Sequence, residues 1–204
     1  MDKELRYFPT ELRIEKREDG STSVEGHAAV FDSLSENLGG FREIIHKGAF
    51  DEVLDDDVRA LFNHDSNLIL GRTKSGTLSI SVDERGLVYR YDSPNTTYAQ
   101  DLLISLERGD VSQSSFGFRV ANVDGSEWEE DEETGALTRH IKKFSRLFDV
   151  SPVTFPAYPS TDVAKRSLED WKEELEKREK EKKEKEGISL LDVQIIINEN
   201  QMKS

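Results

Sequence analysis

Cysteine is absent from the sequence of 204 residues. Its absence excludes disulfide bonds, thiolate zinc sites and cysteine nucleophiles, and it is consistent with a reducing compartment. Long apolar runs are missing too. The first residues contain no apolar stretch of the signal-peptide kind, and no segment reaches the length of a membrane span. We therefore expect an intracellular protein without a membrane partner.

Positive charge is in deficit. The sequence has 28 lysine and arginine residues against 42 aspartate and glutamate residues, a formal net charge of -14. Because phosphate groups are bound by basic surfaces, this balance argues against a nucleic-acid or anionic-membrane partner. Hydrophobic residues make up 35% and charged residues 34% of the chain, so we expect a modest core in one domain with a solvated appendage.

Several catalytic motifs are missing as well. The sequence contains no GxSxG nucleophile elbow and no HExxH motif, which argues against an esterase of the α/β-hydrolase kind and against a zinc hydrolase. The acidic segment 124–135 lacks the ordered ligand spacing of a calcium loop, so we assign no metal to it. We expect no cofactor. We interpret it as a solvated hairpin loop. The alternative is a recognition patch for basic residues of a substrate, or weak cation binding.

The composition changes abruptly near Asp162. Residues 164–186 contain nine basic and nine acidic residues and almost no apolar ones, and apolar residues return at 187–200. We therefore predict one folded domain over residues 1–162. Residues 163–204 are predicted to form a charged helical spacer and a short apolar C-terminal segment, with a docking peptide or tether as the alternative.

The predicted domain is mostly β. Alternating apolar residues on both sides of a turn predict a hairpin over residues 78–92 with one buried face. Further strands are expected at 24–31, 58–64, 136–144 and 146–155, the last two as a β pair.

Two helices are expected in this domain. In the segment 96–110, Thr97 and Gln100 have the spacing of a capping box, and Gly109 is placed to end the helix. The segment 46–56 is interpreted as a short helix. Many strands and few helices indicate a β-rich α+β fold, either a barrel or a sandwich with helices on its outside.

The segment 110–120 reads DVSQSSFGFRV and raises the question of which serine has a chemical role. In a strand, alternate side chains face opposite sides, so Phe116, Phe118 and Val120 share the core face. Ser115 then faces the other way together with Gly117. A glycine inside a strand costs stability, and close approach of another group is one reason to keep it.

Three serines compete for the role of nucleophile. Ser112 and Ser114 have the parity of the core face, whereas Ser115 lies on the opposite face beside the gap at Gly117. We therefore choose Ser115. A serine needs a base to take its proton, and that base is usually histidine.

Four histidines are available as the base. His64 ends the expected strand 58–64 and opens a turn, a position where sites are commonly built. His46 precedes the expected short helix, and His27 and His140 lie within or beside strands. Spacing alone places His64 only slightly ahead of His46.

A third group must orient the imidazole and stabilise its charged form. The candidates are Asp65, Asp110 and Asp149. Asp65 is adjacent to His64 and is placed to cap the turn, and Asp110 follows the helix end. Asp149 lies within an apolar, strand-like run, where an unpaired carboxylate is costly. We therefore choose Asp149, with an ordinary salt bridge as the alternative.

Taken together, these segments resemble a known family. LFNHDSNLILGRT, ERGLVYRYDSPNT, LISLERGDVSQSSFGF and FDVSPVTFPAYP are similar, in order and character, to blocks of the tailed-phage prohead serine proteases, which are related to the herpesvirus assembly proteases, the assemblins. The resemblance covers residues 10–162. Four blocks in the same order are more specific than any one of them.

The resemblance implies site residues. It assigns the family's histidine to His64 and its nucleophile to Ser115. The third position, usually glutamate in the phage family and a second histidine in the herpesvirus relatives, is Asp149 here. By analogy with those relatives, backbone N–H groups at 155–159 would hold the oxyanion, which makes Ala157 and Tyr158, together with Gly117, the candidates for substrate or oxyanion contacts.

The resemblance also implies a fold and a function. It implies a compact β-barrel of the herpesvirus-protease type with surrounding helices. The implied protein is a serine endopeptidase inside the assembling procapsid, in the host cytoplasm. It cuts scaffold protein or the scaffold-like part of the major capsid protein, and also itself. A homodimer is an open question, since dimerisation activates the herpesvirus relatives. The alternative is an inactive assembly module of the same fold.

Overall fold

The computed structural model describes residues 3–9, 11–122, 124–155, 166, 168–178 and 180–182. The chain divides into two units, Met1–Val163 and Ala164–Ser204. In the second unit the described residues are helical, and Arg178 pairs with Glu174 across one turn at 2.6 Å. The apolar segment predicted at 187–200 lies outside the described residues. No helix in the described part of the chain is long and apolar enough to cross a membrane.

The first unit is built mainly from strands. Its α-helix is α1 (Thr97–Arg108), and a single 3-10 turn, η1 (Thr73–Ser75), links two strands. The strands are β1 (Glu4–Pro9), β2 (Arg13–Lys16), β3 (Thr22–Val30), β4 (Phe41–Ile45), β5 (Arg59–Phe62), β6 (Asp65–Arg72), β7 (Leu78–Val82), β8 (Gly86–Asp92), β9 (Gln113–Val120), β10 (Ser126–Glu130), β11 (Leu137–Ile141) and β12 (Phe144–Val153).

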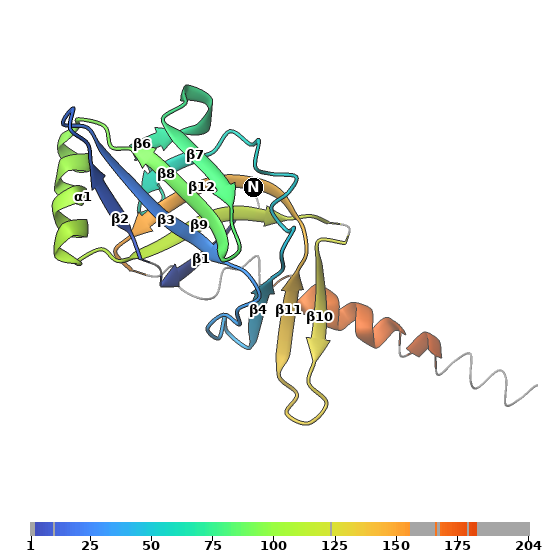
Figure 1. Cartoon of the computed structure of the whole chain (residues 1–204). Helices are drawn as coiled ribbons and strands as arrows, with labels where there is room; N and C mark the ends of the chain where they lie inside the picture. Colours follow the sequence, from blue (N-terminus) through green and yellow to red (C-terminus); the bar gives the residue numbers. More distant parts are fainter. Residues whose placement is uncertain are drawn as a thin grey trace, which may run out of the picture. The chain divides into compact units, whose positions relative to one another are not determined.

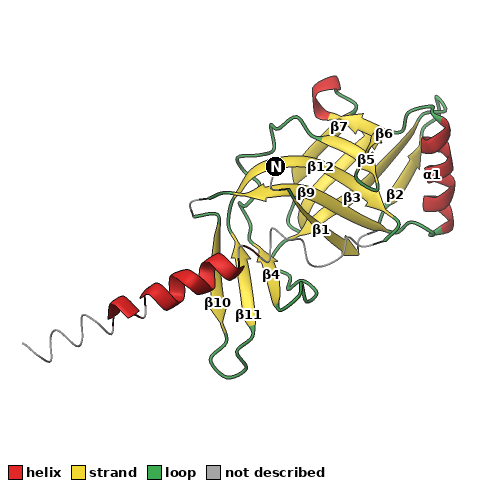
Figure 2. Ribbon diagram, turned by 180° about the vertical axis from the view of Figure 1, so that it is seen from behind, coloured by secondary structure: helices red, strands yellow, loops and turns green. Residues whose placement is uncertain are grey.

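The strands form three sheets. The five-stranded sheet has the order β1-β9-β12-β5-β6, the four-stranded sheet the order β2-β3-β8-β7, and the three-stranded sheet the order β10-β11-β4. Figure 1 shows α1 at one end of the two larger sheets and the small sheet projecting at the other end. Figure 2, from behind, shows β9 and β12 side by side in the large sheet.

The expectation of a compact β-barrel with surrounding helices was wrong. Over the described residues, the strand pairing stops at the edges of three separate sheets, and α1 is the one α-helix of the first unit. The expectation of a β-rich α+β fold is confirmed. Periodicity shows which face of a strand is buried but not which strand edges pair, so closure could not follow from it.

Two local predictions were wrong. The segment 46–56 forms consecutive turns, in which Ala49 N donates to His46 O at 3.1 Å and Val53 N to Phe50 O at 3.0 Å. Gly48 within it has a φ of +88°, a left-handed conformation that interrupts a helix. The last two strands also do not pair with each other, because β11 lies between β10 and β4 whereas β12 lies between β9 and β5.

Other local predictions are confirmed. The hairpin over 78–92 consists of β7 and β8, with Leu78 opposite Tyr91 and Tyr89 fully buried. Helix α1 ends at Gly109, whose φ is +79°. Its N-cap is Thr96, one residue earlier than expected, and no side chain caps the first turn.

The core is aromatic where it supports β9. Phe116 and Phe118 lie on the core face of β9, as their parity predicted, with ring centroids 4.7 Å apart. Phe144 of β12 contacts Phe118 at 4.9 Å, and Phe50 contacts Phe144 at 4.5 Å. All four rings are fully buried, so β9 and β12 are held rigidly against one core.

Four buried charges join β1 to the three-stranded sheet. Arg6 bonds both carboxylate oxygens of Glu43, at 2.8 Å for the longer bond, and Glu4 at 2.7 Å. Arg139 bonds Glu4 and Glu43, each at 3.1 Å. Two guanidinium and two carboxylate groups balance, which is how buried charges are tolerated. We call these four residues the charge quartet.

Removal of one carboxylate from the charge quartet should be costly. Glu43→Gln leaves two buried guanidinium groups with one counter-charge, so we expect a loss of about 3–5 kcal/mol in the free energy of unfolding, measured by urea denaturation. The control is Glu52→Gln, which breaks an exposed pair with Lys143 and should cost less than about 1 kcal/mol. Equal losses in the two variants would contradict this prediction.

The charge quartet also predicts acid sensitivity. Burial raises the pKa of Glu43, but Arg6 and Arg139 lower it more, so it lies below its ordinary value of 4.5. A carboxyl with a lower pKa in the folded chain contributes its stability above the unfolded pKa and loses it as the pH falls through the folded pKa. Urea denaturation should therefore show stability falling below about pH 4.5, with a smaller fall in Glu43→Gln. An equal fall in both proteins would sink this assignment.

Candidate active site

Ser115, His64 and Asp149 lie in one hydrogen-bonded chain. His64 Nε2 is 2.7 Å from Ser115 Oγ, and His64 Nδ1 bonds Asp149 Oδ2. Ser115 and Asp149 are almost fully buried, and the His64 side chain is 12% exposed. The three side chains therefore have the order hydroxyl, imidazole, carboxylate, in which a base can take a proton and be stabilised once charged.

A β-bulge turns Asp149 toward this site. Leu147 of β12 lies opposite Phe118 of β9, and Asp149 lies opposite Gly117, with a register shift between the two pairs. If the strand had no bulge and Phe148 paired with Gly117, Asp149 would lie opposite Phe116 and face the core. The bulge places it on the face of Ser115, one cross-strand diagonal away. Bulges commonly re-aim a side chain in this manner.

A tight turn positions His64. Asn63 and His64 link β5 to β6 and have φ values of +53° and +59°. Both central residues of a type I′ hairpin turn need positive φ, and asparagine and histidine are among the side chains that tolerate it. Asn63 Nδ2 donates to Thr154 Oγ1 at 3.1 Å, and Thr154 N donates to Asn63 Oδ1 at 2.8 Å. The histidine turn is therefore fixed to the end of β12.

The carboxylate of Asp149 has three partners. His64 is one of them. The other two are Lys3, whose Nζ donates to Oδ1, and Ser151, whose Oγ donates to Oδ2 at 3.2 Å. Burial raises the pKa of Asp149, but the hydrogen bond and charge of His64, then those of Lys3, lower it more, so the net shift is downward. Asp149 is therefore an anion at neutral pH.

Gly117 has a packing role beside this carboxylate. A Cβ atom there would overlap Lys3 Cε and lie 2.6 Å from Asp149 Oδ1. The gap that the sequence predicted next to Ser115 therefore exists, but Lys3 and Asp149 fill it. Nothing in this geometry supports the predicted contact of Gly117 with a substrate or an oxyanion.

The other histidines lie elsewhere. His46 Nε2 and His140 Nδ1 are 2.9 Å apart, and their rings stack at 5.2 Å between centroids. His27 Nε2 lies 3.0 Å from Asp83 Oδ2. His64 alone among the four bonds a serine of β9. The structure thus separates His64 from His46, which spacing could not do.

The remaining candidate acids and serines have local partners. Asp65 Oδ1 accepts from Asn67 N at 2.8 Å, which is the predicted turn cap. Asp110 pairs with Arg108 at 2.9 Å. Ser114 Oγ lies 2.9 Å from Tyr89 OH in the core, and Ser112 is exposed. Neither serine has a histidine partner.

Ser115 has a second partner that sequence reasoning missed. Tyr7 of β1 lies opposite Ser115, and Ser115 Oγ donates to the backbone carbonyl of Arg6 at 2.8 Å. The hydroxyl has one proton and two acceptors within reach, His64 Nε2 and Arg6 O. Strand β1 therefore covers Ser115, which has no exposed surface.

Ser151 and Lys3 were also missed. Strand alternation from Asp149 could have indicated Ser151, whereas no local pattern links Lys3 to a residue 146 positions away. Ala157 and Tyr158, the predicted oxyanion candidates, lie outside the described residues. Among the residues that the structure describes, no group of three or more histidine or acidic side chains could hold a metal ion.

The acidic segment 124–135 forms β10 and a turn. Asp131 Oδ1 accepts from Thr134 N at 2.8 Å, and Trp128 packs on Phe41 at 5.0 Å between ring centroids. Glu127 pairs with Lys142 at 2.6 Å. The segment is thus a solvated hairpin in the small sheet, as interpreted from the sequence, although its first half is strand.

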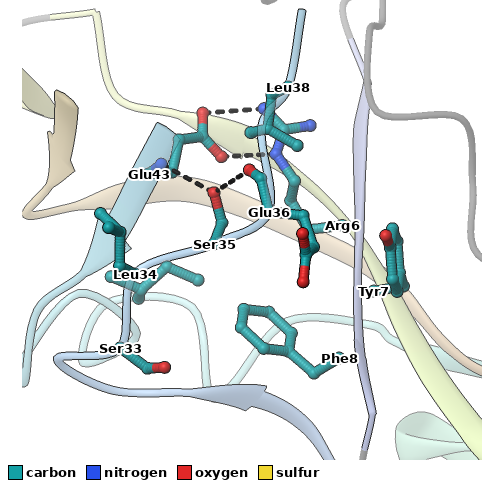
Figure 3. Close-up of a pocket in the computed structure, with 10 residues that line it drawn as sticks. Arg6, Tyr7, Phe8, Ser33, Leu34, Ser35, Glu36, Leu38 and Glu43 are labelled. Atoms are coloured by element: carbon teal, nitrogen blue, oxygen red, sulfur yellow. Dashed lines mark hydrogen bonds and ion pairs between the residues drawn. The ribbon is translucent and has the colours of Figure 1, made fainter. Parts of the chain in front are cut away.

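A cavity of about 140 Å³ lies along β1. It is lined by Arg6, Tyr7 and Phe8 of β1 and by the loop that contains Leu34 and Leu38. Figure 3 shows the ion pair of Arg6 with Glu43 beside it. The residues Ser115, His64 and Asp149 do not line this cavity, so it is not the candidate active site.

Three comparisons relate this chain to known proteins. A family model described as caudovirus prohead serine protease matches residues 10–174. The prohead protease of Enterobacteria phage HK97 is 31% identical over 169 residues, which cover 79% of this chain and 67% of the HK97 protein. The structure of the bacteriophage T4 capsid assembly protease, gp21, is similar with a TM-score of 0.43 and 11% identity, over 74% of this chain and 96% of that one.

The family match extends over most of the first unit and includes all three residues of the hydrogen-bonded chain. The chain belongs to the caudovirus prohead serine protease family.

Proposed function

We propose that this protein is an endopeptidase of capsid maturation with Ser115 as nucleophile, His64 as general base and Asp149 as the group that orients His64. One observation supports this assignment most directly: the unbroken contact from Ser115 Oγ through both ring nitrogens of His64 to Asp149. The family membership supports the reaction class, and the geometry supports the choice of residues.

The proposed mechanism is acyl transfer. His64 Nε2 takes the proton of Ser115 as Oγ attacks the scissile carbonyl carbon, and the imidazolium then gives that proton to the leaving amine. The acyl group remains on Oγ until water, activated by the same base, releases it. Asp149 holds the Nδ1–H tautomer and stabilises the imidazolium. Backbone N–H groups hold the oxyanion, and the segment 155–159 is proposed for this role by analogy.

Two structural features compensate for the shorter side chain of Asp149. Aspartate replaces the glutamate that the resemblance leads us to expect, so its carboxylate must lie closer to the imidazole. The bulge in β12 and the hydrogen bond from Ser151 bring it there. This arrangement supports the proposal that Asp149 orients His64 although its side chain is one methylene shorter than glutamate.

The proposed substrates are the scaffold protein and the scaffold-like part of the major capsid protein, cut inside the procapsid in the host cytoplasm. Self-cleavage and a homodimer remain part of the proposal. We further propose that residues 163–204 serve as a spacer with a scaffold-docking end. The net charge of -14 supports protein substrates over nucleic acid.

One observation favours a second candidate, an assembly module without activity. Ser115 has no exposed surface, and its hydroxyl donates to Arg6 O, so a substrate carbonyl cannot reach it in this state. Activity requires that this hydrogen bond break and that β1 move so that a substrate can reach Ser115. The same observation fits an enzyme in a resting state, and experiment separates the two.

The first test is co-expression with the cognate capsid and scaffold proteins, read by intact mass. Wild-type protein should give truncated products, and Ser115→Ala should give full-length ones. Ser112→Ala is the control, because that serine is exposed and has no histidine partner, and it should cleave as wild type does. Equal cleavage by Ser115→Ala would remove Ser115 from the mechanism. No cleavage by any variant would favour the inactive module.

A second test addresses Asp149. Asp149→Asn keeps the shape of the side chain but no longer fixes the Nδ1–H tautomer or stabilises the imidazolium. We expect the cleavage rate to fall by about a thousandfold to ten-thousandfold, measured from the time course of product mass. The matched control, Asp110→Asn, breaks an exposed pair and should leave the rate within about twofold. A tenfold loss or less in Asp149→Asn would show that Asp149 is a structural acid only.

A further inference from the structure

Lys3 contacts the acid of the candidate active site from outside the three-residue chain. Its Nζ donates to Asp149 Oδ1, while His64 bonds the other oxygen of the same carboxylate. The Lys3 side chain is 31% exposed and that of Asp149 is 3% exposed. A buried carboxylate is therefore shared between an ammonium group and an imidazole.

The sheet is shaped to receive Lys3. It immediately precedes β1, whose residues Leu5 and Tyr7 lie opposite Gly117 and Ser115. The absent side chain at Gly117 leaves the space that the end of Lys3 occupies, since a Cβ there would overlap Lys3 Cε. The charge quartet, which includes Glu4 and Arg6, fixes the strand that follows. Lys3 is therefore held at the site by the gap at Gly117 and by the fixed strand that follows it.

We propose that Lys3 is a positioning residue of the active site, which fixes the carboxylate of Asp149 and sets how readily His64 becomes protonated. This inference rests on the proposed function, because it assigns a role within the same site. Two groups compete for the charge of Asp149. The ammonium group of Lys3 reduces the attraction that the carboxylate exerts on the imidazolium. Removal of the Lys3 charge should therefore strengthen the attraction between the carboxylate and the imidazolium form of His64.

In the described part of the chain, two further cations lie on the strands that flank Asp149. Arg59 of β5 lies opposite Asp149 and pairs with Asp57 at 3.1 Å. Arg119, on the same face of β9, lies over the ring of Phe148 at 5.7 Å. Lys3 is thus the cation that bonds the carboxylate directly.

The test is a histidine NMR titration of the full chain. The imidazole signals of wild type and Lys3→Met are followed against pH, and the His64 signal is identified by its loss in His64→Gln. Methionine keeps the packing beside Gly117 and removes the charge. We expect the His64 titration midpoint in Lys3→Met to rise by about half to one pH unit, since a charge within about 4–6 Å shifts a titration and Lys3 is partly exposed. In a cleavage assay, the acidic limb of the rate profile should move in the same direction.

Three further variants make the outcome decisive. Lys3→Arg keeps the charge and should restore the midpoint. Lys16→Met removes an exposed lysine that pairs with Glu107 at 2.6 Å and should leave the midpoint unchanged. Lys3→Gln replaces Lys3→Met if the latter does not fold. An unchanged midpoint without the Lys3 charge, or an equal rise in Lys16→Met, would overturn the inference.

The two proposals fail in different ways. If Ser115→Ala cleaves as wild type does, the proposed nucleophile is wrong whatever the titration shows, and if no variant cleaves, the proposed activity is wrong. If cleavage needs Ser115 but the His64 midpoint does not respond to Lys3, only the role of Lys3 is wrong.

Discussion

The ladder between β9 and β12 is the constraint on which the site depends. Ser115 and Asp149 occupy neighbouring strands, and their side chains meet only because the bulge at Phe148 reverses the facing of everything that follows it. The aromatic core behind both strands leaves no freedom to slide, since a shift by one residue would bring Asp149 against Phe116. The register between β9 and β12 therefore determines whether Asp149 can contact His64, in addition to how the core packs.

The second constraint is electrostatic. The large sheet holds a carboxylate with little access to water, and a carboxylate in such a place must be matched. One face of β1 does this through Lys3, and the other face carries Glu4 and Arg6 of the charge quartet. A single edge strand thus connects Ser115, Asp149 and the small sheet. The same strand covers Ser115, so access to this serine and order in the candidate site are coupled.

Sequence alone could predict those parts of the site that depend on one strand or one turn. Parity within β9 favoured Ser115, and the end of β5 indicated His64 without separating it from His46. Asp149 was chosen because an acid in an apolar run needs a partner, yet alternation could not show the bulge that turns it toward His64. The sequence did not show that the strands form three separate sheets. It also did not show the contacts that Lys3 makes with Asp149 and that the Arg6 carbonyl makes with Ser115. Each of these features depends on contacts between segments far apart in the chain.

These long separations have a consequence for the time at which the site forms. His64 and Ser115 are 51 positions apart, His64 and Asp149 85, and Lys3 and Asp149 146. Contacts between distant segments form late, and a chain leaving the ribosome cannot make them before the last partner has been synthesised. A nascent or incomplete chain therefore has a serine and a histidine without their acid. The candidate site is therefore complete only after the last strand of the first unit has been synthesised.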